Sequence, residues 1–280
     1  MPNLRGPDER RRRLYMNVAI SVVLYGAPVW GDVIARSKLL PALYRLQRTI
    51  AQRVISAYRT VSSNAALLLA RLPPLKFMAM SRKRVYEFTK RSREDGSYSP
   101  ETLKDIKEAE ALRLCNEWRE LLEKPNTPGE WTKLAIVPRL EAWMARDSGS
   151  SGMSYHLTQI FTGHGCFANF LRRIGKRRDA SCDFCGEEDN AFHTMRECPY
   201  WDLERIRLRN TLELSREFTL GDVVEAIVES KANWKAFSAY VEEVMKDKEE
   251  EERRREREKR LPLIPTGMTA QSEGAVTTRW

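Results

Sequence analysis

The chain has 280 residues, and its 48 lysines and arginines outnumber its 39 aspartates and glutamates, giving a formal net charge of +9 at pH 7. Hydrophobic residues make up 42% of it, close to the share in folded chains, and the length allows one large domain or two smaller ones. A positive surface attracts polyanions, so nucleic acid is a better candidate partner than an anionic membrane. Of the five cysteines, two lie far apart from the other three, and with no signal peptide they favour reduced thiols in an intracellular protein that is not secreted over a disulfide framework.

The first predicted element is a helix that follows the charged segment at residues 8–13. Its apolar positions recur at helical spacing, at Leu14, Val18, Val22 and Tyr25. The Gly-Ala-Pro sequence at residues 26–28 ends it. The apolar run at residues 14–30 contains Asn, Ser, Gly and Pro, and it is shorter than the roughly 20 residues needed to cross a bilayer. We interpret this run as a core segment and expect no membrane partner.

Three helices with basic faces are expected next, at residues 39–57, 62–72 and 78–93. The first carries its apolar side chains at spacings of three and four, with arginines on the other faces. A basic helix face is most often only solvated, but three in succession indicate a surface that faces phosphates. The candidate nucleic-acid contacts in this region are Arg45, Arg48, Arg82, Lys83 and Arg84.

The middle of the chain has a different composition. Residues 101–124 mix acids and bases that can pair at i,i+4, which predicts a helix with a bridging or packing role. Proline and glycine at residues 125–129 interrupt it, and another helix is expected at residues 130–146. The sequence Asp-Ser-Gly-Ser-Ser-Gly at residues 147–152 is typical of a flexible link, so we place a domain boundary there.

A strongly basic segment follows the link. Residues 155–178 predict two short helices that are hinged at the Gly-His-Gly sequence of residues 163–165, which is more simply a turn than a ligand-binding loop. The candidate nucleic-acid contacts in this segment are Arg172, Arg173, Lys176, Arg177 and Arg178. Phe184 and Phe192 follow closely, and cations next to aromatic faces are how single-stranded nucleic acid is held. Either ring can equally belong to the core, which we favour for Phe192.

Three cysteines and a histidine then follow in the pattern C-x2-C-x7-H-x4-C. They are Cys182, Cys185, His193 and Cys198. Structural zinc takes four thiolate or imidazole ligands, and a C-x2-C pair presents two sulfurs to one ion from a single tight turn. Gly186 supplies the positive φ that such a turn often needs. The pattern predicts a Zn²⁺ site; the alternative is a group of unrelated buried thiols. The two remaining cysteines, Cys115 and Cys166, are expected to be reduced.

The chain is expected to end in helices and a tail. Pro199 suits the first turn of a helix that runs to about residue 214. Further helices are predicted from Thr219 or Asp222 and from Lys231 onward. Every residue from 246 to 260 is charged, and because the two signs nearly cancel, this run predicts a solvent-exposed helix and not a basic nucleic-acid-binding tail. Residues 261–280 are predicted to be disordered.

Taken together, three stretches resemble the C-terminal part of the reverse transcriptase polyprotein of arthropod non-LTR retrotransposons, of the Jockey-like group and the elements that insert into ribosomal DNA. They are LYGAPVW at residues 24–30, the segment from Leu-Gln-Arg at 46–48 to Leu-Pro-Pro-Leu at 72–75, and the segment from Gly-His-Gly at 163–165 to Cys-Pro-Tyr-Trp at 198–201. The resemblance implies a mainly α fold in which a helical, thumb-like bundle is followed by a small helical zinc-knuckle domain. In that family the knuckle is thought to bind nucleic acid.

The resemblance also divides the chain into regions. Residues 1–98 would be the thumb-like region that follows the polymerase palm, and residues 99–147 the connecting helices. Residues 148–215 would be the CCHC zinc-knuckle module. Residues 216–260 would form C-terminal helices, and residues 261–280 a disordered tail.

The catalytic features of the resembled family are missing from this sequence. RNA-directed DNA polymerase chemistry needs carboxylates that hold two metal ions about 3.5 to 4 Å apart, and the resemblance places two of them in an X-X-Asp-Asp turn. The sequence contains no Asp-Asp pair, and it lacks the family's N-terminal endonuclease. We therefore expect no catalytic residue here, and we interpret the sequence as a fragment, a truncated element copy or a gene model that begins at an internal methionine.

The leading functional hypothesis is a zinc-dependent nucleic-acid-binding region that binds the element's RNA or its target DNA in a nuclear or cytoplasmic ribonucleoprotein, with no small-molecule substrate. One alternative is a zinc-stabilised adaptor of a co-opted element, which binds protein. A less favoured alternative is a restriction-like nuclease, whose signature joins Pro-Asp to an acidic-x-Lys motif. Here Pro7-Asp8 lies far in the sequence from Asp105-Ile-Lys107. The sequence does not separate RNA from DNA.

Overall fold

The computed structural model describes residues 6–34, 37–146 and 152–260, and these residues form helices without a single β-strand, which confirms the predicted mainly α fold. The helices of the first half are α1 (Glu9–Val23), α2 (Ala27–Ile34), α3 (Leu40–Val54), α4 (Ser63–Ala70), α5 (Leu75–Glu94), α6 (Pro100–Leu122), α7 (Glu130–Ile136) and α8 (Leu140–Ala145). Those of the second half are α9 (Tyr155–Thr162), α10 (Ala168–Arg173), α11 (Asp202–Leu212), α12 (Leu220–Glu229) and α13 (Lys231–Arg260).

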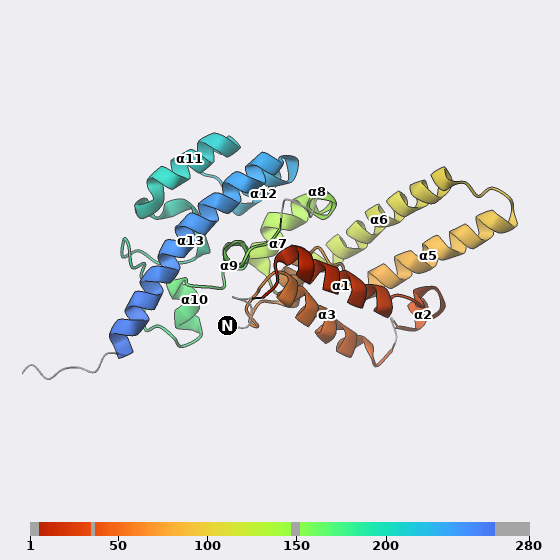
Figure 1. Ribbon diagram of the computed structural model, residues 1–280, viewed down its shortest axis with the longest axis horizontal. Coiled ribbons are helices and arrows are strands. Elements are labelled where there is room, and N and C mark those ends of the chain that lie inside the picture. Colours follow the sequence, from red (N-terminus) through yellow and green to blue (C-terminus); the bar gives the residue numbers. More distant parts are fainter. Residues whose placement is uncertain (1–5, 35–36, 147–151, 261–280) are drawn as a thin grey trace, which may run out of the picture.

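Two long elements give the molecule its shape. Helices α5 and α6 lie side by side as a hairpin that extends from one end, and α13 runs past α9, α11 and α12 at the other end (Figure 1). The turn into α6 is closed by a capping box, because the Ser99 hydroxyl accepts from the N–H of Thr102 and the Thr102 hydroxyl accepts from the N–H of Ser99. The capping box therefore fixes where the second arm of the hairpin begins.

A buried aromatic cluster joins the helices on both sides of the predicted domain boundary. The indole of Trp143 in α8 packs against Phe161 of α9 and Trp234 of α13, and its Nε1 donates to the carbonyl of Leu68 in α4 over 2.8 Å. One continuous hydrophobic core therefore includes residues before and after the link. The link itself at residues 147–151 and the predicted tail at 261–280 lie outside the described residues, so both the boundary and the tail stay predictions.

Helix α1 buries a different face from the one that the sequence analysis favoured. The buried side chains are Met16, Ile20 and Leu24, each at most 5% exposed. The predicted stripe is instead exposed, at Leu14 61%, Val18 54%, Val22 71% and Tyr25 91%. The core segment expected at residues 14–30 is therefore only partly buried, because from Leu14 onward α1 carries more than one apolar stripe and packing against α3 buries the other one.

The apolar N-terminal helices bear on whether the chain could cross a membrane. No single helix among the described residues is long and apolar enough to cross a bilayer. The pair formed by α1 and α2 passes a test of length and composition only when both are taken together, and its two halves are bent by 77°.

Candidate metal centre

A tight turn between α10 and α11 presents the first two cysteines. The N–H of Gly186 donates to the carbonyl of Cys182 over 2.9 Å, and the N–H of Cys182 donates to the carbonyl of Glu187 over 2.7 Å. Gly186 has a φ of +85°, the left-handed conformation that the sequence analysis expected of it. The turn thereby brings the sulfurs of Cys182 and Cys185 to one place.

The other two candidate ligands lie at the two ends of a single π-helical turn, η2 (His193–Glu197): His193 is its first residue, and Cys198 directly follows it. The side-chain carbonyl of Asn190 accepts from the N–H of His193 over 2.9 Å and fixes the start of the turn. The N–H of Cys198 donates to the carbonyl of His193 over 2.8 Å and closes it. Such wide turns are rare and often occur at functional sites. Pro199 then begins η3 (Pro199–Trp201), which leads into α11 as predicted.

The four candidate ligands converge with the spacing of a tetrahedral site. The Sγ of Cys198 lies 3.9 Å from that of Cys182 and 3.8 Å from that of Cys185, and the Sγ of Cys185 lies 3.3 Å from Nε2 of His193. A tetrahedral ion with metal–sulfur bonds of about 2.3 Å holds its sulfurs about 3.8 Å apart. All four ligand atoms lie within 4.8 Å of one another, so the cluster can hold a metal ion and the donor set fits zinc.

Burial makes a cation necessary if these thiols are to be ionised together. Cys182, His193 and Cys198 are each at most 4% exposed. Burial and, to a smaller extent, the neighbouring Cys182 and Cys185 raise the pKa of Cys198 to about 12. Thiolates are the form that binds metal, so a bound ion would both draw off the protons and neutralise the negative charge.

An ion pair with a distant helix anchors residues 182–198, the segment with the four candidate ligands, hereafter the metal-binding loop. Both carboxylate oxygens of Asp189 accept from Nζ of Lys248 in α13 over 2.8 Å, and the two side chains are only 2% and 4% exposed. The same carboxylate accepts from the N–H of Ala168 over 2.7 Å and from the hydroxyl of Thr194 over 3.0 Å. Burial opposes the charge of Lys248, but Asp189 outweighs it and raises the pKa of the ammonium above its ordinary value. Helix α13 is therefore part of the support of the metal centre.

The sequence analysis did not predict this ion pair. Lys248 lies in the run at residues 246–260 where every residue is charged, so its composition does not distinguish it. Its position does, because it continues the buried face of α13 formed by Val241, Val244 and Met245. A lysine at a position that continues a buried apolar stripe was therefore the sequence feature that could have predicted the ion pair.

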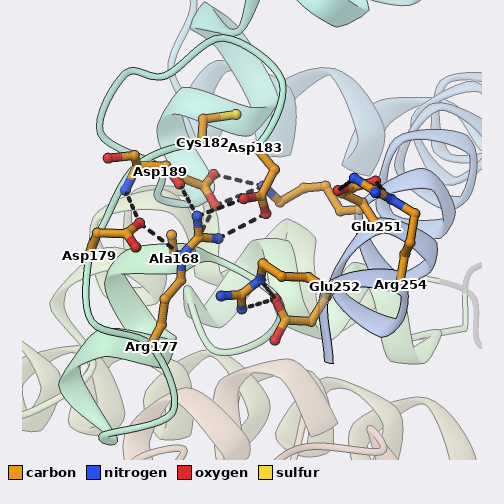
Figure 2. A network of polar contacts seen from close by, with 12 residues as sticks. Ala168, Arg177, Asp179, Cys182, Asp183, Asp189, Glu251, Glu252 and Arg254 are labelled. Carbon is orange, nitrogen blue, oxygen red and sulfur yellow. Dashed lines mark hydrogen bonds and ion pairs between the residues drawn. The ribbon is translucent and has the colours of Figure 1, made fainter. Parts of the chain in front are cut away.

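One of the predicted nucleic-acid contacts, Arg177, is part of the protein's own framework. Figure 2 shows its side chain between Asp179 and Asp183, beside the backbone of the metal-binding loop. Its Nη2 also donates to the carbonyl of Ser181 over 2.7 Å, and the residue is 9% exposed. Burial opposes its charge, but the two carboxylates raise its pKa above the ordinary value. Arg177 thus holds the start of the loop.

The four other predicted contacts in this segment are exposed. They are Arg172, Arg173, Lys176 and Arg178. They lie on the end of α10 and on the loop that leads to Cys182, so the fold leaves a group of cations directly before the metal centre. Their contact with nucleic acid stays a prediction.

The five predicted contacts of the N-terminal half have different surroundings. Arg45 is exposed on α3, whereas Arg48 donates to the carbonyls of Arg59 and Val61. On α5, the guanidinium of Arg82 donates to the carbonyl of Leu24 over 3.2 Å. Its two neighbours are ion-paired: Lys83 with Asp32 and Glu87, and Arg84 with Glu110 and Glu117. The structure does not gather these five residues next to the metal centre, since they lie on α3 and α5.

The two phenylalanines of the loop are both partly buried. Phe184 packs against Tyr200 and Trp201, with ring centroids 4.4 and 4.7 Å away. Phe192 makes an edge-to-face contact with Trp131 of α7 at 6.1 Å, and the guanidinium of Arg196 lies 4.2 Å above its ring. Each ring therefore contributes to packing and still presents part of its surface.

The fold and the site together define a mainly helical protein with a Cys3His cluster that can hold a metal ion and follows an exposed basic segment. Over 198 residues, 66% of its length, the chain is 29% identical to a retrovirus-related Pol polyprotein from the type-1 retrotransposable element R1 4 of Nasonia vitripennis. Over 244 residues, 84% of its length, it is 27% identical to a 115 kDa protein of the type-1 retrotransposable element R1DM of Drosophila melanogaster. The chain is thus a relative of R1 non-LTR retrotransposon polyproteins, which confirms the resemblance noted in the sequence.

The matches extend over only part of these relatives. They cover 47% of the Nasonia polyprotein and 23% of the Drosophila protein. No protein-family model matches the chain. No solved structure matches it either.

Proposed function

We propose that this chain is a zinc-dependent nucleic-acid-binding part of an R1-type retrotransposon polyprotein, which binds the element's RNA or its target DNA. One observation carries the proposal: a tetrahedral Cys3His cluster lies directly after a segment with four exposed cations. The metal would stabilise the loop, and the cations would contact phosphates. Because three of the four candidate ligands are buried and all four would be occupied by the metal, they would act on nucleic acid only through the side chains that they hold in place.

The bound metal is tested first, because the proposal depends on it. The purified chain should contain about one zinc per molecule, and Cys182→Ser should lose it. Cys115→Ser is the matched control, since Cys115 is also a buried free cysteine but lies on α6, apart from the cluster. Zinc content well below one per chain, or content that Cys182→Ser leaves unchanged, would contradict the metal centre.

Binding is then measured by fluorescence anisotropy with labelled single-stranded RNA and DNA across a salt series. Four phosphate contacts predict a slope of log affinity against log salt of about −3, because each contact with a single strand contributes about −0.7. Lys176→Gln combined with Arg178→Gln should weaken binding and make the slope shallower. Lys104→Gln with Lys107→Gln removes the same charge from exposed positions of α6 and should have a smaller effect. No binding at low salt, or equal effects of the two double variants, would refute the assignment of the surface.

A further inference from the structure

An aromatic groove joins the metal-binding loop to the N-terminal helical region. Two cavities of about 490 and 360 Å³ share Trp131, Phe170 and Arg173 in their linings, so they lie next to each other and together make up the aromatic groove. One end lies at Thr60, in the loop between α3 and α4. The other end lies at residues 190–192, directly before the metal ligand His193. The metal centre therefore borders one wall of this groove.

Three partly exposed flat rings line the aromatic groove: Trp131, His164 and Phe192. The indole Nε1 of Trp131 donates to the carbonyl of Ile160 over 2.8 Å, which fixes the plane of that ring. His164 stacks on the buried Phe170 with centroids 4.7 Å apart and an interplanar angle of 27°. Contacts with the protein thus fix the orientation of the rings, while each ring remains partly exposed to solvent.

The imidazole of His164 is held in its neutral form. Nη2 of Arg173 lies 3.1 Å from Nε2 of His164, and the hydroxyl of Thr60 lies 3.0 Å from Nδ1. A guanidinium can only donate, so Nε2 accepts, and Nδ1 carries the proton that it donates to Thr60. Burial and then the charge of Arg173 lower the pKa of His164 to about 4. At neutral pH the ring therefore offers an uncharged stacking face.

The charges around the groove favour an anionic strand. Arg173 is exposed and uses one nitrogen on His164, while a guanidinium has five N–H donors. Arg196 lies over Phe192 at the knuckle end, but it is ion-paired with Glu197 and Glu217. The acidic side chain in the lining, Glu130, is ion-paired with Lys133 over 2.9 Å. Arg173 therefore has donors available at the groove, and the acidic side chain in the lining already has a lysine partner.

We propose that the aromatic groove binds unpaired bases of a single-stranded nucleic acid, which stack on Trp131 and His164 while Arg173 contacts the adjoining phosphate. Cavities of this size fall in the range of about 300 to 1,000 Å³ that holds small ligands in general. Bases in a duplex already stack on one another, so the groove discriminates single strands from duplexes. This inference rests on the proposed function and adds to it the form of nucleic acid that is preferred.

Paired substitutions separate the stacking role from a structural one. His164→Phe keeps a flat ring and removes both hydrogen bonds, whereas His164→Leu removes the ring. Binding of a single-stranded oligonucleotide should survive in His164→Phe and fall about fivefold or more in His164→Leu, as expected for loss of a stacked base. Zinc content and the thermal unfolding midpoint are measured on both variants, because a role in folding alone would depend on packing and not on the flat ring.

The arginines provide the second comparison. Arg173→Gln should lower the affinity for single strands more than the affinity for duplexes, so that their ratio falls about threefold or more. Arg178→Gln removes the same charge from an exposed position that does not line the groove, and it should lower both affinities alike. Photo-crosslinking of a 5-iodouridine oligonucleotide to the wild-type chain should label peptides that contain Trp131 or His164, and this holds even where a variant fails to fold.

The outcomes also separate this inference from the function on which it rests. Two results would refute binding in the groove and leave the proposed function standing. In the first, binding depends on salt but the crosslinks lie elsewhere. In the second, Arg173→Gln and Arg178→Gln have equal effects on the affinities for single strands and for duplexes. Absence of any binding by the zinc-loaded wild-type chain at low salt overturns both.

Discussion

Replacing Lys248 by methionine is expected to destabilise the protein by about 3 to 5 kcal/mol, because it leaves the Asp189 carboxylate buried without its cation. The carboxylate is 2% exposed, and its remaining partners are the N–H of Ala168 and the hydroxyl of Thr194. Neither carries a charge that could balance it. Adding Asp189→Asn removes the stranded charge and keeps a hydrogen-bond acceptor, so the double variant should be more stable than Lys248→Met alone.

Urea unfolding followed by circular dichroism measures this effect. With a denaturant dependence of about 3 kcal/mol per molar urea, the midpoint should fall by about 1 to 1.7 M. Lys246→Met is the matched control, since Lys246 is exposed on the same helix and should change stability by less than about 0.5 kcal/mol. Zinc release to a chromophoric chelator should also become faster in Lys248→Met. A loss under about 1 kcal/mol, or a double variant that is no better than the single one, would show that the ion pair does not support the metal centre.

Three further outcomes are expected. Gly186→Ala should weaken zinc binding about fivefold in a chelator competition, because its φ of +85° strains an L residue although a Cβ would meet no atom within 4 Å; unchanged affinity would argue against a role for this turn. Burial lowers the pKa of His156, but hydrogen bonds and charges from two α13 glutamates outweigh burial and raise this pKa to about 9. The stability that His156 adds is therefore fully present below pH 6.5 and is lost as the pH rises through 9. The difference in unfolding free energy between wild type and His156→Gln should therefore shrink over that interval, and a constant difference would contradict it. Chelation should lower the thermal midpoint of the wild type and leave that of Cys198→Ser unaffected, and equal shifts in both would count against metal binding by this cluster.

The convergence of Cys182, Cys185, His193 and Cys198 could be predicted from sequence because the four residues are close together in the chain. Four ligands within 17 residues are constrained by the spacing of the chain itself, and Gly186 marks the turn. Most helices were predictable for the same reason, since apolar periodicity and caps such as Thr219 are read within one segment. In each case the information lies within a few residues of the feature.

What the sequence did not reveal depends on contacts between distant segments. Arg177 and Arg178 are equivalent in the sequence, yet only Arg177 meets Asp179 and Asp183 and is buried. The exposed face of α1 was assigned to the core because spacing alone cannot choose between two apolar stripes. Likewise the groove combines α7 with residues 163–174 and 190–192, which no single stretch of sequence brings together.

The contact of Lys248 with the metal-binding loop also predicts what happens to the protein when copies of such an element acquire stop codons. A stop codon in the first half of α13 would spare all four candidate metal ligands and the exposed cations that precede them, so a search for sequence motifs would classify the gene as intact. The encoded protein would nevertheless have lost the only described cation that pairs with Asp189, which lies 59 residues upstream of it in the chain. Reading frames that end before residue 248 are therefore expected to encode a knuckle with a complete ligand set and a weakened hold on its metal.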